Sequence, residues 1–222
     1  FYGRGYHKKG GLHASEFISE QMQQAGLEHF FQHSYFQKFD ISVRIYPKKP
    51  VFELNGQTLE AGKAFSFEMN SEKIRGNYKL IRLDTCKSYN YNDHITLFAD
   101  KSIIPIINSQ QEKLDLFKSR PVFVSCKTLP AWAISTTLQP LRPFKGYILT
   151  DLLSTEENML RIKIKPGFYK ACPVQNVAGI DKGSNGKFIF ITAHYDHLGQ
   201  ICDNYYPGAN DNASGVALML DL

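Results

Sequence analysis

Two stretches near the C-terminal end decide the fold of this chain: FIFITAHYDHLG over residues 188–199 and YPGANDNASG over residues 206–215. In the first stretch, an apolar run ends abruptly in the pattern His194-x-Asp196. In the second, the carboxylate of Asp211 lies among glycine, alanine and serine residues at the start of another apolar segment. The pairing of a buried run with polar groups at its end is typical of a site built on a sheet.

The apolar run over residues 187–193 predicts a central strand, because it is apolar at the positions of both faces. Ligand sites in open α/β sheets gather at the C-terminal ends of such strands, where His194 falls. A neutral imidazole is the commonest protein ligand for a metal ion. Residues i and i+2 of a strand share a face, so Asp196 can accept a hydrogen bond from the second imidazole nitrogen. That contact would fix the tautomer of the ligand.

The second stretch offers a carboxylate with room around it. Asp211 has two oxygens and can therefore bridge two metal ions. On spacing alone, Asp211 or Asn212 can equally be the cap of the helix that follows, and this alternative stays open. Asn212-Ala-Ser214 also matches a glycosylation acceptor, which we treat as a coincidence because a glycan would block the proposed site.

The rest of the chain reads as one helix followed by many short strands. Apolar residues at helical spacing predict a helix over residues 12–27. Asn55-Gly56 predicts a tight hairpin, and the strict alternation over residues 160–165 predicts a strand with one wet face. Short strands with turn signals indicate a β-rich module. We also expect a strand at 95–99 and a helix within 110–119, whereas the proline of residues 103–105 argues against a regular strand there. We interpret His94 as a surface histidine.

We therefore expect an α/β fold, in which a mixed sheet flanked by helices carries a β-rich insert. The expected parts are residues 1–40, the insert over 41–170, and the first part of the core over 171–222.

Composition excludes several functional classes. The net charge of +5 over 222 residues is small and scattered, so we expect no nucleic-acid partner. No apolar run approaches the roughly 20 residues that span a bilayer, and no signal peptide is visible. The four cysteines show no C-x-x-C spacing, which argues against a cysteine zinc site and leaves disulfides and free thiols equally open.

Together, residues 193–199 and 207–215 closely resemble the co-catalytic-zinc aminopeptidases and carboxypeptidases of the bacterial leucyl aminopeptidase and glutamate carboxypeptidase type. The two motifs occur in the family's order and at its separation. The Gly3-Arg-Gly start, the N-terminal helix and Gln175-Asn-Val are similar as well. The β-rich middle resembles the protease-associated insert of these relatives.

The resemblance implies a two-zinc site that hydrolyses peptide bonds through a metal-bridging water. It implies that His194 binds one zinc ion, that Asp211 bridges both, and that Asp196 orients His194 as the catalytic aspartate. It also implies a cis peptide bond between Asp211 and Asn212, a peptide substrate, and export from the cell. It implies nothing about oligomeric state.

The family pattern also needs a later Glu-Glu pair, an Asp and a His, and the chain ends eleven residues after Asp211. Glu156 and Glu157 are a tempting substitute, but they precede the central strand, and we assign them to solvent. We therefore expect this chain to be truncated and inactive alone. Two alternatives are a single-zinc enzyme like glutaminyl cyclase and a non-catalytic binding ectodomain of the same fold, as in the transferrin receptor.

Overall fold

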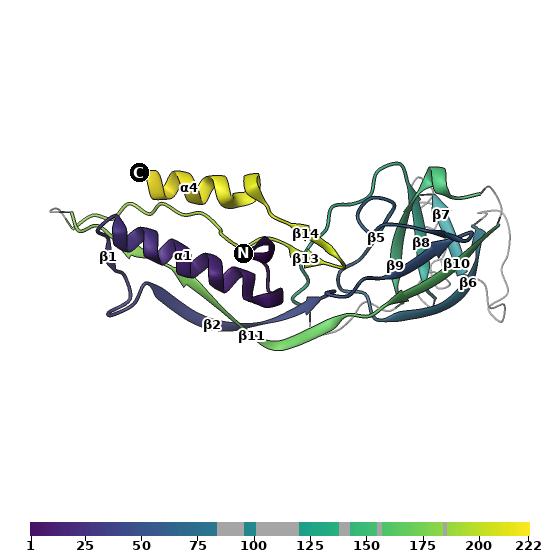
Figure 1. Cartoon of the computed structure of the whole chain (residues 1–222), viewed down its shortest axis with the longest axis horizontal. Coiled ribbons are helices and arrows are strands. Elements are labelled where there is room, and N and C mark those ends of the chain that lie inside the picture. Colours follow the sequence, from purple (N-terminus) through teal and green to yellow (C-terminus); the bar gives the residue numbers. More distant parts are fainter. Residues whose placement is uncertain (84–95, 101–119, 138–142, 155–156, 184–185) are drawn as a thin grey trace. The chain divides into compact units, whose positions relative to one another are not determined.

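The computed structural model describes residues 1–83, 96–100, 120–137, 143–154, 157–183 and 186–222 (Figure 1). The chain divides into two compact units, one formed by 1–47 and 168–222 and the other by 48–167. The predicted α/β class is confirmed, since a helical unit accompanies a β-rich one. His94, residues 103–105 and the helix expected within 110–119 lie outside the described residues.

The second unit holds an eight-stranded mixed sheet with strand order β4-β3-β10-β6-β7-β8-β9-β5. Strands β6, β7, β8 and β9 are parallel to one another, and the other neighbouring pairs of the sheet are antiparallel. Its strands are β3 (Val51–Leu54), β4 (Gln57–Thr58), β5 (Phe65–Phe67), β6 (Ile74–Arg82), β7 (Thr96–Asp100), β8 (Val122–Cys126), β9 (Lys145–Leu149) and β10 (Glu157–Ile164); a short helix η4 (Thr150–Leu152) follows β9.

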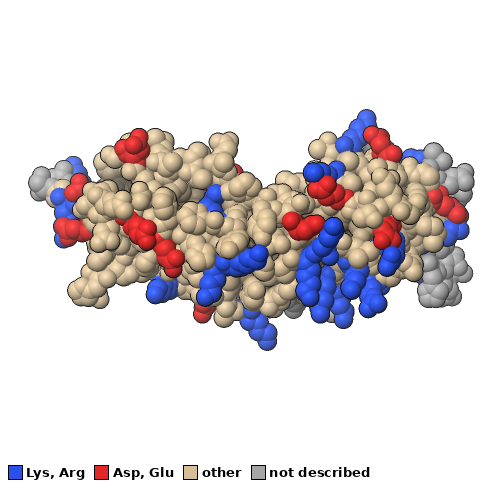
Figure 2. Space-filling model, viewed as in Figure 1, with Lys and Arg blue, Asp and Glu red and all other residues tan. Residues whose placement is uncertain are grey.

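Strand β10 shows how the sequence pattern sets this sheet. Its residues alternate between exposed and buried along the whole strand, which confirms the predicted wet face. It lies between β3 and β6, so its lysines and arginines cover a sheet face rather than an edge. Arg161 pairs with Glu53 of β3 at 3.0 Å, and Glu157 pairs with Lys79 of β6 at 2.7 Å. Figure 2 shows positive and negative side chains close together on this unit.

The predicted hairpin forms at Asn55-Gly56, between β3 and β4. Both residues have positive φ, 52° and 82°, as the favoured two-residue hairpin turn requires. Below the turn, the aromatic core of the unit is tightly stacked: the ring centroids of Phe52 and Phe65 are 3.9 Å apart, and Phe123 meets Phe52 edge-on. These contacts anchor β3 on the sheet.

The first unit combines two helices with three small two-stranded sheets. The pairs are β1 with β12, β2 with β11, and β13 with β14. Its elements are η1 (Tyr2–Arg4), η2 (His7–Lys9), α1 (Gly10–Gln24), β1 (Glu28–His29), β2 (Phe36–Ile45), β11 (Gly167–Val177), β12 (Gly179–Ile180), β13 (Gly199–Ile201), β14 (Asn204–Tyr206), η5 (Ala209–Ala213) and α4 (Ser214–Asp221).

Helix α1 begins two residues before the predicted start and ends near Gly26, whose φ of +83° suits the residue that follows a helix. Its buried face packs against α4, because Ile18 and Met22 join Val216 in one apolar cluster. Ala193 and Tyr195 pack against the same cluster. The chain that leads into the His194 motif is therefore held between the two helices, as Figure 1 shows.

The predicted central strand at 187–193 is wrong for this structure. The segment is extended but unpaired, and the side chains of Phe188, Ile189, Phe190 and Ile191 are 56–90% exposed. A strand with two apolar faces is buried only where neighbouring strands and covering helices exist. Among the described residues, none pairs with this segment. The sequence pattern therefore shows that the segment is apolar, but whether the segment is buried depends on neighbouring strands.

The described helices are short, with 15 residues in α1 and eight in α4. Within the described part of the chain, none is long and apolar enough to cross a membrane. Three of the four cysteines, Cys126, Cys172 and Cys202, are buried and form no disulfide.

Candidate metal centre

Two loops of the first unit meet beside the hairpin β13–β14. The first loop, residues 194–198, leads into β13, and the second loop, residues 207–213, leads out of β14 into α4. Gly199 pairs with Tyr206 at the base of the hairpin, so the chain leaves the hairpin next to the point where it entered. This reversal brings residues of the two sequence motifs into contact.

The side chains of His194 and Asp211 point at each other across the two loops. Nε2 of His194 lies 3.2 Å from Oδ1 of Asp211, although 17 positions separate them in the sequence. Both side chains are open to solvent, with 54% of His194 and 72% of Asp211 exposed. The structure therefore brings together the two residues that the sequence marks as metal ligands.

Asp196 lies beside the other nitrogen of the same imidazole. Its carboxylate Oδ1 is 3.6 Å from Nδ1 of His194, while its main-chain oxygen is closer, at 3.2 Å. If Nδ1 donates its proton to that carbonyl, the lone pair of Nε2 faces Asp211. The main chain of Asp196 thus orients the imidazole at least as directly as its carboxylate, and the catalytic role of Asp196 stays a prediction.

His197 is a further member of the site that sequence reasoning missed. Its Nδ1 lies 2.9 Å from the carbonyl oxygen of Tyr206, and its Nε2 is 3.6 Å from Oδ2 of Asp211. Its side chain is only 15% exposed. The two histidines therefore approach the two oxygens of one carboxylate. Its position in the quoted motif, three residues after His194, was the available signal.

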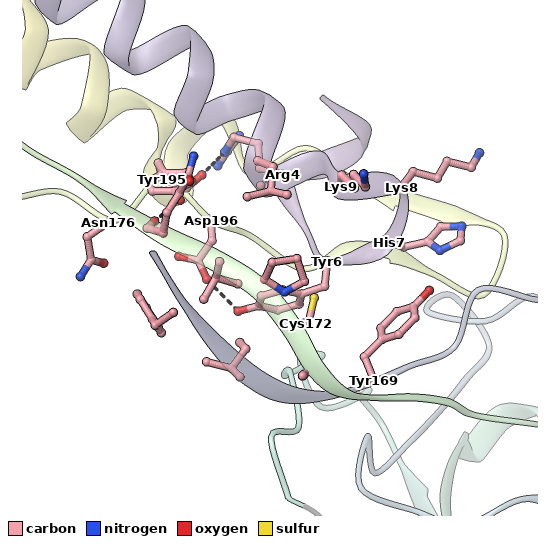
Figure 3. Close-up of a pocket in the computed structure, with 18 residues that line it drawn as sticks. Arg4, Tyr6, His7, Lys8, Lys9, Tyr169, Cys172, Asn176, Tyr195 and Asp196 are labelled. Carbon is pink, nitrogen blue, oxygen red and sulfur yellow. Dashed lines mark hydrogen bonds between the residues drawn. The ribbon is translucent and has the colours of Figure 1, made fainter. Parts of the chain in front are cut away.

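Two residues of the N-terminal segment also contact the site, and neither stands out in the sequence as a site residue. Arg4 donates hydrogen bonds to main-chain oxygens of both loops, and Tyr6 donates one to Oδ2 of Asp196 at 3.3 Å (Figure 3). Burial raises the pKa of Tyr6 to about 12, and the charge of Asp196 adds to that rise. Burial lowers the pKa of the Arg4 guanidinium, while Asp196 and Asp211 oppose this effect. Tyr6 therefore stays a hydrogen-bond donor at neutral pH.

These residues form one wall of a cavity of about 630 Å³. The β2–β11 ribbon also lines the cavity, through residues that include Phe39 and, labelled in Figure 3, Tyr169 and Cys172. Burial raises the pKa of the Cys172 thiol, and the charge of Asp40 adds to this effect. Asp196 and Tyr6 line this cavity, whereas His194 is not among its lining residues.

The turn that carries Asp211 has an unusual backbone. The peptide bond between Asp211 and Asn212 is cis, as the family resemblance implies. The side chain that bonds to the start of α4 is that of Asn212 rather than Asp211. Its Oδ1 accepts a hydrogen bond from the main-chain nitrogen of Gly215 at 3.2 Å. The carboxylate of Asp211 is thereby left to face the two histidines.

The donor set suits a zinc ion but offers few ligands. Zinc binds imidazole nitrogen and carboxylate oxygen at about 2.0–2.2 Å, which keeps two tetrahedral donors roughly 3.4 Å apart. The 3.2 Å between His194 and Asp211 is close to that separation. Within the described residues, no group of three or more His, Cys, Asp or Glu side chains is arranged to hold a metal ion.

A histidine and an aspartate that meet from adjacent loops of an α/β unit are typical of a metal-binding protein. Comparison with known proteins indicates which family of such proteins this chain resembles. Residues 176–222 match the model of peptidase family M28. Over 51 residues, the chain is 43% identical to aminopeptidase YwaD of Bacillus subtilis (strain 168), a match that covers 22% of this chain and 10% of that protein.

Two solved structures share the fold. One is an aminopeptidase from Aneurinibacillus sp. strain AM-1, with a TM-score of 0.53, 17% identity, and coverage of 96% of this chain and 52% of that chain. The other is BSAP, a zinc aminopeptidase from Bacillus subtilis, with a TM-score of 0.55, 16% identity, and coverage of 96% and 50%. This chain spans about half the length of both structures.

The segment that contains both site loops matches the model of peptidase family M28, and this match confirms the family resemblance drawn from the two motifs.

Proposed function

We propose that the protein is a zinc-dependent exopeptidase, an aminopeptidase, that hydrolyses peptide bonds at the site of His194 and Asp211. The observation that carries the proposal is the 3.2 Å approach of these two side chains, inside the segment that matches a peptidase family. The 43% identity to an aminopeptidase over 51 residues supports the same activity.

The described residues supply specific parts of such a site. His194 offers Nε2, with its ring held through Nδ1 by the main chain of Asp196. Asp211 offers two carboxylate oxygens, one toward each histidine, so that it can serve two ions. Bound zinc would polarise the scissile carbonyl and lower the pKa of a water molecule. Two zinc ions per complete protein are part of this proposal.

We propose further that chain 1–222 alone binds zinc weakly and turns over no substrate. Zinc in catalytic sites takes three protein ligands, and among the described residues one imidazole and one carboxylate meet at the ion position. Among the described residues, no glutamate pairs with His194 or Asp211 as a candidate general base, and Glu157 pairs with Lys79. Turnover of substrate by the isolated chain would contradict this part of the proposal.

The test measures zinc stoichiometry and hydrolysis of aminoacyl-p-nitroanilides by the full-length protein. We expect His194→Ala and Asp211→Asn to lower kcat/KM at least a hundredfold and to reduce bound zinc. His13→Ala is the matched control, because His13 is an exposed histidine of α1 that lies 3.6 Å from Glu16 and beside the ring of Tyr2. Unchanged activity in both site variants would refute the proposal.

The same measurements separate the alternatives. One zinc ion per chain, with cyclisation of N-terminal glutamine and no peptide hydrolysis, would favour the enzyme like glutaminyl cyclase. A protein that binds no zinc and hydrolyses nothing would favour the non-catalytic ectodomain.

We also propose that residues 48–167 form a protease-associated-like insert and that the protein is exported. The support is topological, since this β-rich unit interrupts the other unit between residues 47 and 168. Cell fractionation with an antibody against the protein tests export, and recovery only in the cytoplasm would contradict it.

A further inference from the structure

Arg4 makes more contacts to the candidate centre than any other N-terminal residue in the described chain, and it reaches both loops. Its Nε donates to the carbonyl oxygen of Tyr195 in the first loop at 2.6 Å. Its two terminal nitrogens donate to carbonyl oxygens of the second loop: those of Pro207, Gly208 at 2.7 Å and Asp211 at 3.2 Å. One side chain thus joins two loops that begin about 190 and 200 residues after it.

The main chain on either side of Arg4 packs directly against the main chain of the β13–β14 hairpin. The main-chain nitrogen of His197 donates to the carbonyl oxygen of Arg4 at 3.3 Å. A Cβ atom on Gly5 would lie 2.5 Å from Cα of Gly199, and one on Gly3 would lie 2.8 Å from the carbonyl oxygen of Tyr206. The N-terminal segment is therefore in direct backbone contact with the base of the hairpin that separates the loops.

The chemistry of this contact favours arginine. Four carbonyl oxygens converge from two loops, and their dipoles repel one another unless donors lie between them. A guanidinium has five N–H donors in a rigid planar fork, whereas a lysine ammonium has three on a flexible stem. Tyr195 is next to His194 in sequence, and one of the other acceptors belongs to Asp211 itself. The position of Arg4 therefore fixes the main chain on both sides of the 3.2 Å gap between the two metal-ligand candidates.

We propose that Arg4 is a positioning residue that sets the separation of His194 and Asp211 and thereby the zinc affinity of the centre. The inference rests on the proposed function, because it needs a zinc site to act on. It assigns a role in the site to a residue whose side chain donates its hydrogen bonds to main-chain oxygens of the two loops.

The experiment compares the zinc affinity of full-length wild type, Arg4→Lys and Arg4→Ala by competition with a chromogenic chelator. We expect the affinity to fall at least tenfold in both variants, and methylguanidinium to restore part of it in Arg4→Ala but not in Arg4→Lys. Arg161→Met is the control, since it removes an exposed arginine of β10 whose partner is Glu53, and we expect its zinc affinity to be unchanged.

The melting temperature of the zinc-free proteins provides the second readout. A purely structural role would lower this temperature and leave the zinc affinity of the folded variants at the wild-type value, which would overturn the inference. Should Arg4→Ala fail to fold, Arg4→Lys decides alone, and wild-type affinity in that variant overturns it. Wild type that binds no zinc would overturn the proposed function together with this inference, so the two failures are distinguishable.

Discussion

At the scale of single residues, Gly208 shows how closely the second loop is packed. Its φ is +60°, and a Cβ atom there would overlap the carbonyl oxygen of Asp211 and the ring of His197. Gly26 has a similar backbone, with φ of +83°, but a Cβ atom there would have nothing within 4 Å. A substitution at Gly26 therefore measures the free-energy cost of the left-handed backbone alone, whereas one at Gly208 adds the cost of steric overlap.

We expect Gly26→Ala to lower the free energy of unfolding by about 1 kcal/mol, the usual cost of a left-handed backbone. Gly208→Ala has the same backbone cost and must also displace Asp211 or His197. We expect it to be destabilised by more than Gly26→Ala and to lose zinc affinity, whereas Gly26→Ala keeps it. Urea unfolding and zinc titration of both variants provide the measurements, and equal behaviour would show that the second loop adapts freely.

The thiol of Cys202 supports a prediction about pH. Burial raises its pKa to about 12 from an ordinary value of 9.0, and the neighbouring Asp203 adds to the rise. Because the folded pKa exceeds the unfolded one, the protonated thiol favours the fold below pH 9, and this contribution is lost as the pH rises from 9 toward 12.

Only the thiolate reacts with iodoacetamide, and at pH 8 its population falls roughly a thousandfold when the pKa rises from 9 to 12. We expect Cys202 to be labelled at least a hundredfold more slowly in the native protein than in urea, with a rate that climbs steadily up to about pH 12. Peptide mass spectrometry after timed labelling measures both rates. Equal labelling of native and unfolded protein at pH 8 would contradict the burial of this thiol.

At the scale of elements, the turn of the β3–β4 hairpin depends on Asn55 for more than its backbone angle. Its Nδ2 donates to Oδ1 of Asn158, and its Oδ1 accepts from the main-chain nitrogen of Met159, both at 2.8 Å. Asn158 is 1% exposed and also accepts a hydrogen bond from the main chain of Ser154. The side chain of the turn thus ties the hairpin to β10.

Asn55→Gly keeps the positive φ and removes both side-chain hydrogen bonds. We expect a loss of about 1–3 kcal/mol in the stability of the second unit, because each net hydrogen bond contributes roughly 0.5–1.5 kcal/mol. Hydrogen exchange should be faster at the amides of β3 and β10 and unchanged in α1. Zinc binding is the control and should equal that of wild type. A loss of zinc binding would contradict the conclusion that these hydrogen bonds stabilise the second unit.

The elements also show how far sequence reasoning reaches. The alternation over residues 160–165 and the Asn55-Gly56 pair each predict a local structure that forms, because side-chain period and turn angles are local properties. The segment 187–193 fails for the opposite reason: its burial depends on neighbouring strands. His194 and Asp211 were identified from their motifs, whereas Arg4 was missed because its contacts span about 190 to 207 positions.

At the scale of the whole molecule, the apolar segment 188–191 has consequences for solution behaviour. Its four side chains are exposed by 66%, 90%, 74% and 56%, and the main chain beside them forms no sheet with the described residues. Contiguous exposed apolar residues on an unpaired extended chain favour association with other molecules. The solved relatives that share the fold are about twice as long as this chain, so we expect further polypeptide to cover this segment in the full-length protein.

We therefore expect chain 1–222 to bind a hydrophobic dye and to self-associate, and the double variant Ile189→Lys with Ile191→Lys to do both much less. Leu218→Lys on α4 is the matched control, because Leu218 is also exposed, by 64%, but lies on a helix whose main chain is internally bonded. Hydrogen exchange distinguishes the two states of the segment: its amides should exchange rapidly in chain 1–222 and slowly in the full-length protein, where paired strands protect them. Rapid exchange in both proteins would mean that the segment stays unpaired in the full-length protein as well, and would contradict this prediction.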